Sequence, residues 1–314
     1  MGPDPPHSKG SARFALLSGG VGGARLARGI AAATAEATVI VNVGDDDEVY
    51  GLNVSPDLDT VLYTLAGMEG DQGWGVAGDT FTAMDRIAGL GIDTSFRIGD
   101  RDLAINLART TAVTGGEPLS VVTARIASAF GIGMRVLPAT DGRLRTRVLT
   151  TDGDWLDFQD YFVRRRHEDE VAALRFEGAE NAVPAPGVTE AIATAAAVII
   201  GPSNPLLSIW PILAVPGMRE AVAAAPRVIA VSPLFAGQAL KGPAHRVMDS
   251  LGLPSGNLGV IAAYDDLISD IVIDKGDAAD VSSLAPYAKV HVADTRIGDQ
   301  GPAANFARYL VSLL

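Results

Sequence analysis

Short apolar runs alternate with longer amphipathic segments along most of the chain. This alternation predicts a mostly parallel β-sheet with helices on both faces, a Rossmann-like α/β fold. The runs expected to form strands are Phe14–Leu17, Ala37–Val43, Ala197–Ile200, Arg227–Val231, Ile271–Ile273 and Val290–Val292. Amphipathic patterns at Ala24–Ala33 and Asn305–Leu314 predict the first and last helices. We expect residues 13–314 to form one domain of this kind.

The middle of the chain departs from this rhythm. The segments 79–89, 100–114 and 118–130 have helical patterns, and few strand patterns separate them. Residues 143–149 alternate charged and apolar side chains, which is typical of a half-exposed strand. We therefore predict a largely helical insertion at about residues 73–190, which covers the carboxyl ends of the strands.

Composition and charge exclude several classes of protein. Of the 314 residues, 48% are hydrophobic and 20% are charged, as in a globular protein. The net charge of −12 argues against a nucleic-acid partner, because such a partner calls for a basic face. Cysteine is absent, which excludes disulfides and thiolate zinc sites and fits a cytoplasmic location. No apolar run approaches the ~20 residues of a membrane span. Residues 1–12 lack the apolar stretch of a signal peptide, and we interpret them as a flexible arm or a cloning remnant.

A glycine-rich turn follows the first predicted strand and opens the first predicted helix. It contains Gly19, Gly20, Gly22 and Gly23. Glycines allow a ligand to approach the main chain closely, and the N–H groups at a helix start attract phosphate. Arg25 stands where a dinucleotide fingerprint has its third glycine, and no Walker A lysine follows. We predict a phosphate-bearing ligand here; a tight turn without a ligand is the alternative.

An acidic loop follows the second predicted strand. Asn42 precedes four consecutive acids, residues 45–48, which would repel a phosphate unless a cation offsets their charge. Magnesium is bound in proteins through one or two carboxylates together with substrate phosphates. Asp45, with Asp57 or Asp59 from the next helix start, could hold such an ion. The alternatives are a solvated acidic loop and a helix-capping role for the two later aspartates.

Two further clusters have the right residue types for binding. Arg97 opens a charged segment, residues 97–102, and could clamp a carboxylate or phosphate; Asp100 there is a natural N-cap. Ser203 and Asn204 offer short polar groups in a rigid loop after Ile200, although an ordinary connection looks similar. Ligands of open α/β sheets bind beyond the carboxyl ends of the strands, where we expect these loops to meet. The four histidines lie far apart, so we predict neither a catalytic triad nor a zinc site.

Taken together, these motifs resemble the 2-phospho-L-lactate transferase family of coenzyme F-420 biosynthesis. The segments that carry the resemblance run in order along nearly the whole chain: Ser18–Gly23, Asn42 with its acids, Ser55–Tyr63, Trp74-Gly75, Asp79–Phe81, Gly99–Asp102, Phe158–Asp160, Gly201–Pro205, Pro216–Glu220 and Val231–Pro233. The family's turn often has a threonine where this chain has Val21-Gly22.

The resemblance implies a reaction and roles for individual residues. A lactyl- or enolpyruvyl-diphospho-5′-guanosine donor would transfer its phosphorylated three-carbon acid to the 5′-hydroxyl of the deazaflavin Fo, releasing GMP with the help of Mg²⁺. Asp59 and Arg97 occupy positions expected to contact the deazaflavin. Asp45 and Asp59 are the candidates for metal binding and catalysis, and a homodimer is expected. High-GC sequence style weakly favours the enolpyruvyl donor.

Two other classes of protein remain open from the sequence. One is a non-catalytic regulator of the same superfamily that binds a nucleotide sugar; residues 55–63 and 99–102 match the transferases better. The other is a nicotinamide-dependent oxidoreductase. The incomplete glycine motif and the four consecutive acids at 45–48 argue against it.

Overall fold

A computed structural model describes residues 13–33, 36–240 and 242–314. The N-terminal segment 1–12, which we predicted to be flexible, lies outside these residues. The core is a seven-stranded sheet of order β14-β13-β10-β9-β1-β2-β5 in which every neighbouring pair is parallel. Its strands are β1 (Phe14–Ser18), β2 (Ala37–Val41), β5 (Arg135–Pro138), β9 (Ala197–Ile200), β10 (Val228–Val231), β13 (Asp270–Asp274) and β14 (Lys289–Ala293). The predicted α/β fold class is confirmed.

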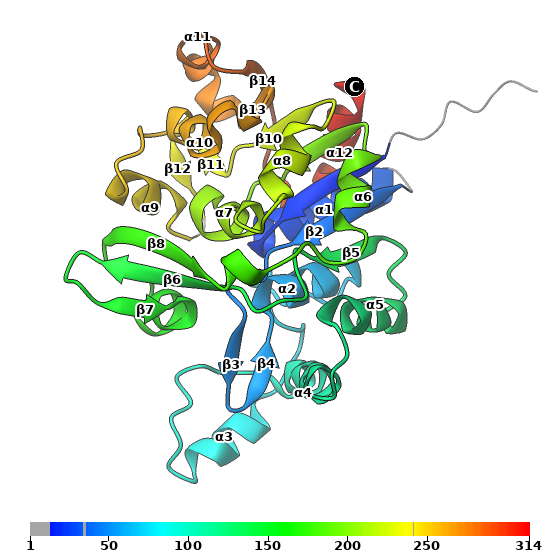
Figure 1. Ribbon diagram of the computed structural model, residues 1–314, viewed down its shortest axis with the longest axis vertical. Coiled ribbons are helices and arrows are strands. Elements are labelled where there is room, and N and C mark those ends of the chain that lie inside the picture. Colours follow the sequence, from blue (N-terminus) through cyan, green and yellow to red (C-terminus); the bar gives the residue numbers. More distant parts are fainter. Residues whose placement is uncertain (1–12, 34–35, 241) are drawn as a thin grey trace, which may run out of the picture.

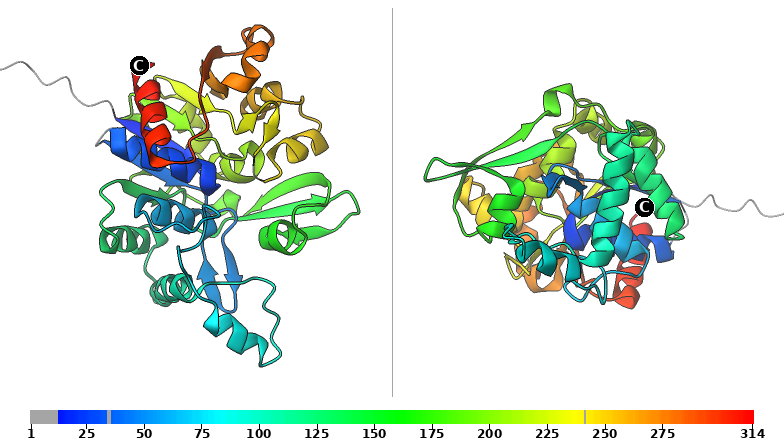
Figure 2. Two further views of the ribbon diagram at one scale, coloured as in Figure 1. Left: turned by 180° about the vertical axis from the view of Figure 1, so that it is seen from behind. Right: turned by 90° about the horizontal axis from the view of Figure 1, so that it is seen from below.

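Helices cover both faces of this sheet. In Figure 1, α6 (Val188–Ala193) and α8 (Met218–Ala223) lie in front of it. From behind, α1 (Gly20–Ala33) and α12 (Gln300–Ser312) are in front (Figure 2, left). Gly29 permits their close contact, because a Cβ atom there would lie 2.4 Å from the Ala303 carbonyl oxygen. The other α-helices are α2 (Pro56–Leu65), α3 (Thr82–Ala88), α4 (Asp100–Thr114), α5 (Leu119–Ala129), α7 (Trp210–Leu213), α9 (Ala244–Ser250), α10 (Asn257–Tyr264) and α11 (Val281–Leu284).

Burial across the sheet explains which strands can be predicted from the sequence. Every residue of β1, β9, β10 and β13 is buried, and each of these strands contains a continuous apolar run, bounded in β13 by Asp270 and Asp274. The edge strand β14 is only partly buried, and its charged and polar residues shorten the apolar run that marks it. The apolar core therefore lies between the central strands and the helices on both faces.

The region predicted as a largely helical insertion is helical over α3, α4 and α5, and beyond them it adds strands. Strand β5 joins the edge of the main sheet beside β2. Strands β6 (Arg145–Thr150), β7 (Trp155–Asp157) and β8 (Val171–Glu177) form a separate antiparallel sheet that projects to one side (Figure 1). The half-exposed strand predicted at residues 143–149 is confirmed as β6, whereas β7 and β8 were not predicted.

The acidic segment predicted as a loop contains a β-hairpin. Strands β3 (Asp47–Val49) and β4 (Leu52–Val54) pair antiparallel across a turn in which Tyr50 and Gly51 have φ of +55° and +76°. Two consecutive positive φ values are the signature of a type I′ hairpin turn. Val49 and Val54 form a small buried cluster with Ile98. The hairpin packs with α3 and α4 in a projection below the sheet (Figure 1). We call this projection, residues 47–54 and 82–114, the arm.

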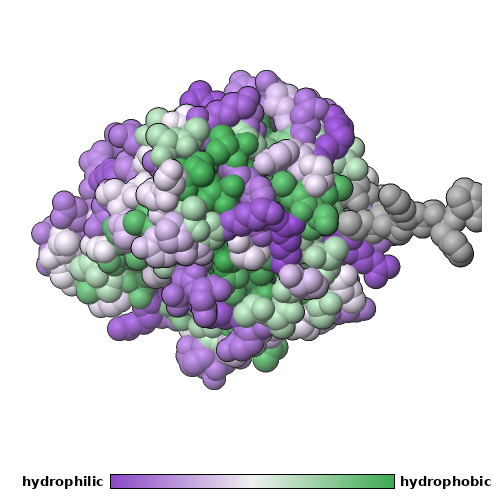
Figure 3. Space-filling view, turned by 90° about the horizontal axis from the view of Figure 1, so that it is seen from above, coloured by the Kyte–Doolittle hydropathy of each residue, from purple (hydrophilic) through white to green (hydrophobic). Residues whose placement is uncertain are grey.

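The face opposite the arm mixes hydrophobic and hydrophilic residues. Figure 3 shows green hydrophobic areas interrupted by purple hydrophilic ones on this face. Among the described residues, no helix combines the length and the apolar character that crossing a bilayer requires.

Candidate active site

The strand order reverses between β1 and β9. From β1 the chain moves outward through β2 to β5, and it then returns to the other side of β1 for β9, β10, β13 and β14. Ligands of open α/β sheets bind at such a switch point, beyond the carboxyl ends of the strands. The glycine turn after β1 and the loop after β9 meet there, and the loop after β2 lies beside them.

The glycine turn is tied to the loop after β9. The Gly19 N–H donates to Ser203 Oγ at 3.0 Å, and the Ser203 hydroxyl donates to the Gly19 carbonyl oxygen at 2.7 Å. The Gly20 N–H donates to Asp57 Oδ1 at 2.6 Å. Two N–H groups of the turn are therefore already bonded within the protein. The N–H groups of Val21 and Gly22 lie in the first turn of α1, where they have no intrahelical acceptor. They are therefore available to bind a phosphate.

Packing accounts for three of the glycines, since a Cβ atom at Gly19 would lie 2.5 Å from Ser208 Cβ. A Cβ atom at Gly22 would lie 2.2 Å from the Pro202 carbonyl oxygen, and one at Gly23 would lie 2.3 Å from Ser18 Oγ. Gly20 has a φ of +61°, which disfavours other residues. The glycine pattern thus has a structural cause at these positions, and phosphate binding at the turn stays a prediction.

Two buried carboxylates share one side-chain amide at the switch point. Asn42 Nδ2 donates to Asp45 Oδ1 and to Asp57 Oδ2, each at 3.0 Å, and both aspartates are 5% exposed. Burial raises the pKa of Asp57 to about 6. Burial, with the charges of Asp57 and Asp46, raises the pKa of Asp45 well above its usual range. Gln159 Nε2 donates to the Asp45 carbonyl oxygen at 2.7 Å and anchors the loop.

Asp46 adds a third buried carboxyl group to this region. The Ser55 hydroxyl donates to its Oδ2 at 2.7 Å, while its Oδ1 is buried without a hydrogen-bond partner. Burial raises the pKa of Asp46 to about 7. The interpretation of a solvated acidic loop is therefore wrong for Asp45 and Asp46, whereas Glu48 of the hairpin is exposed.

Asp59 lies in a different set of contacts. Both of its carboxylate oxygens accept hydrogen bonds from Arg109 of α4, whose side chain is 1% exposed. Burial raises the pKa of Asp59, and Arg109 opposes that rise. The side chains of Asp57 and Asp59 thus bond away from the start of α2, and Ser55, the N-cap residue, makes no side-chain capping bond. Neither side chain caps α2 through a hydrogen bond, so the interpretation of Asp57 and Asp59 as helix caps is wrong.

Arg97 lies in the arm rather than at the switch point. Its guanidinium pairs with Asp85 at 2.7 Å and lies 4.8 Å from the centroid of the Phe81 ring. The predicted N-cap role of Asp100 needs correction. Its carboxylate accepts from the N–H groups at the start of α3, while Asp79 accepts from the N–H groups at the start of α4. This exchange of caps fixes α3 against α4.

Asn204 has a structural bond and a free donor. Its Oδ1 accepts from the Leu206 and Leu207 N–H groups at 3.0 and 3.2 Å, while its buried Nδ2 lacks a partner. Ser18 Oγ, at the end of β1, is also buried without a partner. Such groups at the switch point are suited to a polar ligand.

The sequence interpretation singled out neither Arg109 nor Gln159. Gln159 belongs to the quoted Phe158–Asp160 motif, but nothing in that motif identifies its bond to the loop after β2. Arg109 follows Asp102 and Asn106 at helical spacing, so a polar stripe on α4 was the available signal. Its partner lies 50 residues away in sequence, and only the fold brings the two together.

The donor set fits a magnesium ion held by few protein groups. Among the described residues, no cluster of three or more acidic or histidine side chains is arranged around a common point. Asp45 and Asp57 supply two carboxylates, whereas the oxygens of Asp59 are occupied by Arg109. Magnesium is commonly held by one or two carboxylates and completed by substrate phosphates and water. A cation beside Asp45 and Asp57 would offset the repulsion between them.

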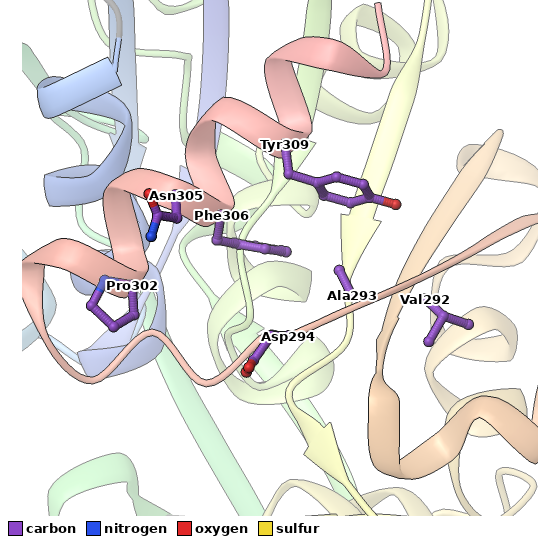
Figure 4. Close-up of a pocket in the computed structure, with 7 residues that line it drawn as sticks. All are labelled: Val292, Ala293, Asp294, Pro302, Asn305, Phe306 and Tyr309. Atoms are coloured by element: carbon purple, nitrogen blue, oxygen red, sulfur yellow. The ribbon is translucent and has the colours of Figure 1, made fainter.

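A hollow of about 460 Å³ lies elsewhere, between β14 and α12 (Figure 4). It is lined by Val292, Ala293, Asp294, Pro302, Asn305, Phe306 and Tyr309. Strand β14 is an outer strand, separated from the switch point by β13 and β10. None of the predicted site residues lines this hollow.

Comparison with known proteins identifies the family of the chain. The family model described as "2-phospho-L-lactate transferase CofD" matches residues 15–304. The chain is 42% identical over 311 residues to a phosphoenolpyruvate transferase of Streptomyces griseus, covering 96% of this chain and 98% of that protein. It is 38% identical over 306 residues to a 2-phospho-L-lactate transferase of Methanopyrus kandleri, covering 96% and 97%.

A solved structure supports the fold. The crystal structure of a UPF0052 family member from Bacillus halodurans superposes with a TM-score of 0.65 at 15% identity, covering 97% of this chain and all of that one. At that identity the likeness concerns the fold alone, whereas the family model and the curated relatives span nearly the whole chain. The chain therefore belongs to the CofD family of 2-phospho-L-lactate transferases.

Proposed function

We propose that the protein transfers a phosphoenolpyruvyl or 2-phospholactyl group from enolpyruvyl- or lactyl-diphospho-5′-guanosine to the 5′-hydroxyl of the deazaflavin Fo. The products are GMP and the corresponding (dehydro) coenzyme F-420-0. The relative called phosphoenolpyruvate transferase is 42% identical and the one called 2-phospho-L-lactate transferase 38%, which favours the enolpyruvyl donor. Mg²⁺ as cofactor, a homodimer and a cytoplasmic location are parts of the same proposal.

One observation carries the proposal. At the switch point, Asp45 and Asp57 converge on Asn42, and Asp57 accepts a hydrogen bond from Gly20 at the start of α1. Carboxylates for a cation thus lie next to N–H groups for a phosphate. A diphosphate bridged by a divalent ion needs both kinds of group at once.

The reaction is a displacement at phosphorus. The Fo hydroxyl oxygen forms a bond to the phosphorus that carries the three-carbon acid. The bond from that phosphorus to the bridging oxygen breaks, GMP leaves with this oxygen, and the hydroxyl proton is released. Bound Mg²⁺ would offset the negative charge of the diphosphate.

The residues of the chain supply positioning and electrostatic stabilisation. The free N–H groups of Val21 and Gly22 would bind phosphate oxygens, and Asp45 and Asp57 would hold the cation. Asp59 would accept a hydrogen bond from the attacking hydroxyl. Phosphoryl transfer depends mainly on such positioning and charge stabilisation.

A product assay tests the proposal. The protein is incubated with Fo, Mg²⁺ and each donor separately, and GMP and phosphorylated deazaflavin are measured by liquid chromatography and mass spectrometry. We expect both products, faster with the enolpyruvyl donor, and none in EDTA. Asp45→Asn should lower the rate and raise the Mg²⁺ concentration required, whereas Glu48→Gln, in the same acidic run but exposed, should change neither.

The other protein classes give different results in the same set of measurements. Tight binding of a uridine-diphosphate sugar without turnover would favour the regulator. Tight nicotinamide-dinucleotide binding would favour the oxidoreductase. Thermal stabilisation by each ligand measures this binding, because a ligand that binds only the native state raises its stability.

A further inference from the structure

A set of largely buried polar contacts joins α2 to α4. Arg109 binds both oxygens of Asp59 and donates to Asn106 Oδ1 at 2.8 Å. Asn106 Nδ2 donates to Asp102 Oδ1 at 3.0 Å, and the Tyr63 hydroxyl donates to the same oxygen at 2.7 Å. Because these five residues link the two helices at both ends, we call them the α2–α4 ladder.

Helical spacing places the members of the ladder on facing sides. Asp59 and Tyr63 are four residues apart on α2, and Asp102, Asn106 and Arg109 follow at intervals of four and three on α4. Residues at these spacings lie on one face of a helix. Asn106, Arg109 and Tyr63 are at most 1% exposed and Asp59 is buried, so most of the ladder is shielded from solvent, while Asp102 is half-buried.

Stability alone does not account for a buried arginine here. Removing two charges from water costs about as much as their mutual attraction returns, and apolar replacements of buried ion pairs are often neutral or stabilising. The bidentate pair instead fixes the direction of a carboxylate, because a planar guanidinium constrains both oxygens at once. What the Asp59–Arg109 contact supplies is a defined orientation of Asp59.

The ladder also connects Asp59 to the arm. Ile98, next to Arg97, is buried against Val49 and Val54 of the hairpin, and α4 begins two residues later at Asp100. Arg97 and Arg109 thus belong to one continuous unit packed on the hairpin. A ligand that contacts both Arg97 and Asp59 would meet groups whose separation the ladder sets.

We propose that Arg109 is a positioning residue: it holds the Asp59 carboxylate in a fixed orientation relative to the arm, so that Asp59 can receive the acceptor hydroxyl. This inference rests on the proposed function. It also leaves the cation to Asp45 and Asp57, since the two oxygens of Asp59 are held by the Arg109 guanidinium.

Single-turnover kinetics test this inference, because the amplitude reports the active fraction and the rate constant reports positioning. Arg109→Lys keeps the charge but loses the bidentate geometry. We expect its rate constant to fall about 10- to 100-fold, the scale of a misplaced reacting group. The amplitude and the KM for the guanylylated donor should stay within twofold. Tyr63→Phe, which removes the other end of the ladder, should slow the step at least threefold.

A surface pair supplies the matched control. Arg125 pairs with Glu117 at 2.8 Å on the exposed side of α5, so Arg125→Lys should leave every constant unchanged. Binding of Fo without Mg²⁺, followed by its fluorescence, is a readout independent of turnover. Its Kd should rise several-fold in Arg109→Lys and stay constant in Arg125→Lys.

The outcomes separate this inference from the proposed function. A wild-type protein that forms no product would refute the proposed function, and this inference with it. A wild type that turns over, with an Arg109→Lys rate constant within twofold of it, would refute only the positioning role. Loss of amplitude with an unchanged rate constant would also refute it, because the role would then be structural. If Arg109→Lys fails to fold, Tyr63→Phe decides in the same assay.

Discussion

Replacing Asp57 with asparagine should make the metal-free protein more stable at pH 8. Burial raises the pKa of Asp57 from its ordinary 3.8 to about 6. In the unfolded chain the group therefore loses its proton at lower pH than in the folded protein. The folded state binds more protons between these values, so its stability falls as the pH rises through this window.

The magnitude follows from the same two values. A rise from 3.8 to about 6 corresponds to about 3 kcal/mol lost once the pH exceeds the folded pKa. Asparagine avoids this loss, but its single carbonyl oxygen cannot accept from both Gly20 and Asn42 as the carboxylate does. One lost hydrogen bond costs about 1 kcal/mol. The net expectation is a gain of about 2 kcal/mol, or roughly 3 °C in Tm for a chain of this size.

Thermal unfolding in EDTA at several pH values measures this effect. The advantage of Asp57→Asn should be full at pH 8 and vanish near pH 4. Glu117→Gln, at an exposed ion pair, should change the unfolding free energy by less than about 1 kcal/mol at every pH. Added Mg²⁺ should raise the Tm of the wild type more than that of Asp57→Asn, because under the proposed function the ion would bind both carboxylates of the wild type and only one of the variant.

Two results would refute the reasoning. If Asp57→Asn is less stable than the wild type at pH 8 in EDTA, burial does not penalise the ionised carboxylate. If the difference in Tm is the same at pH 4 and pH 8, the change acts through packing rather than charge. An equal Mg²⁺ response in both proteins would remove Asp57 from the cation site.

Two further predictions concern packing and pH. Gly22→Ala should destabilise the protein by about 1–3 kcal/mol in urea unfolding, because its Cβ would collide with the Pro202 carbonyl. Gly133→Ala, at a site open to space, should not be destabilised. Equal urea midpoints for the wild type and Gly22→Ala would contradict the contact. Burial would raise the pKa of Asp270, but its hydrogen bonds to Arg227 and His291 outweigh burial and lower it. Asp270→Asn should therefore cost about 2 kcal/mol at pH 7, the scale of a hydrogen bond to a charged group. The depressed pKa contributes stability that is present above pH 3.8 and lost below it, so the cost of Asp270→Asn should shrink in acid; a cost independent of pH would contradict this.

The sheet could be predicted from sequence because its central strands are buried on both faces. Such strands carry continuous apolar runs, and the run from Ala197 to Ile200 coincides with β9. Strand β5 has four residues, begins with an exposed arginine and ends in proline, so no apolar run marks it. The hairpin of β3 and β4 was hidden by its acids, although Gly51 between apolar residues is a hairpin signal.

The site shows a different limit. Position after a strand predicted that Asn42, Asp45 and Ser203 would gather at one edge of the sheet, because parallel strands place their carboxyl ends together. Which acid meets which partner depends instead on how the arm packs. Asp57 and Asp59 are two residues apart on one helix, yet one faces the glycine turn and the other faces Arg109. Helical geometry alone predicts that they diverge, but it cannot predict that a cation from α4 lies opposite only one of them.

Because Asp57 and Asp59 face different partners, the two carboxylates have different roles in the acidic site. A carboxylate bound on both oxygens by arginine is already compensated, so it competes weakly for a divalent ion. A carboxylate that shares an asparagine amide with a second carboxylate is undercompensated, and a cation is the most effective way to relieve it. Asp57 and Asp59 therefore differ in what they can bind even though the sequence offers the same side chain twice. The long-range contact of Arg109 determines that difference, and it makes α4 part of the site although no residue of α4 belongs to the loops at the switch point.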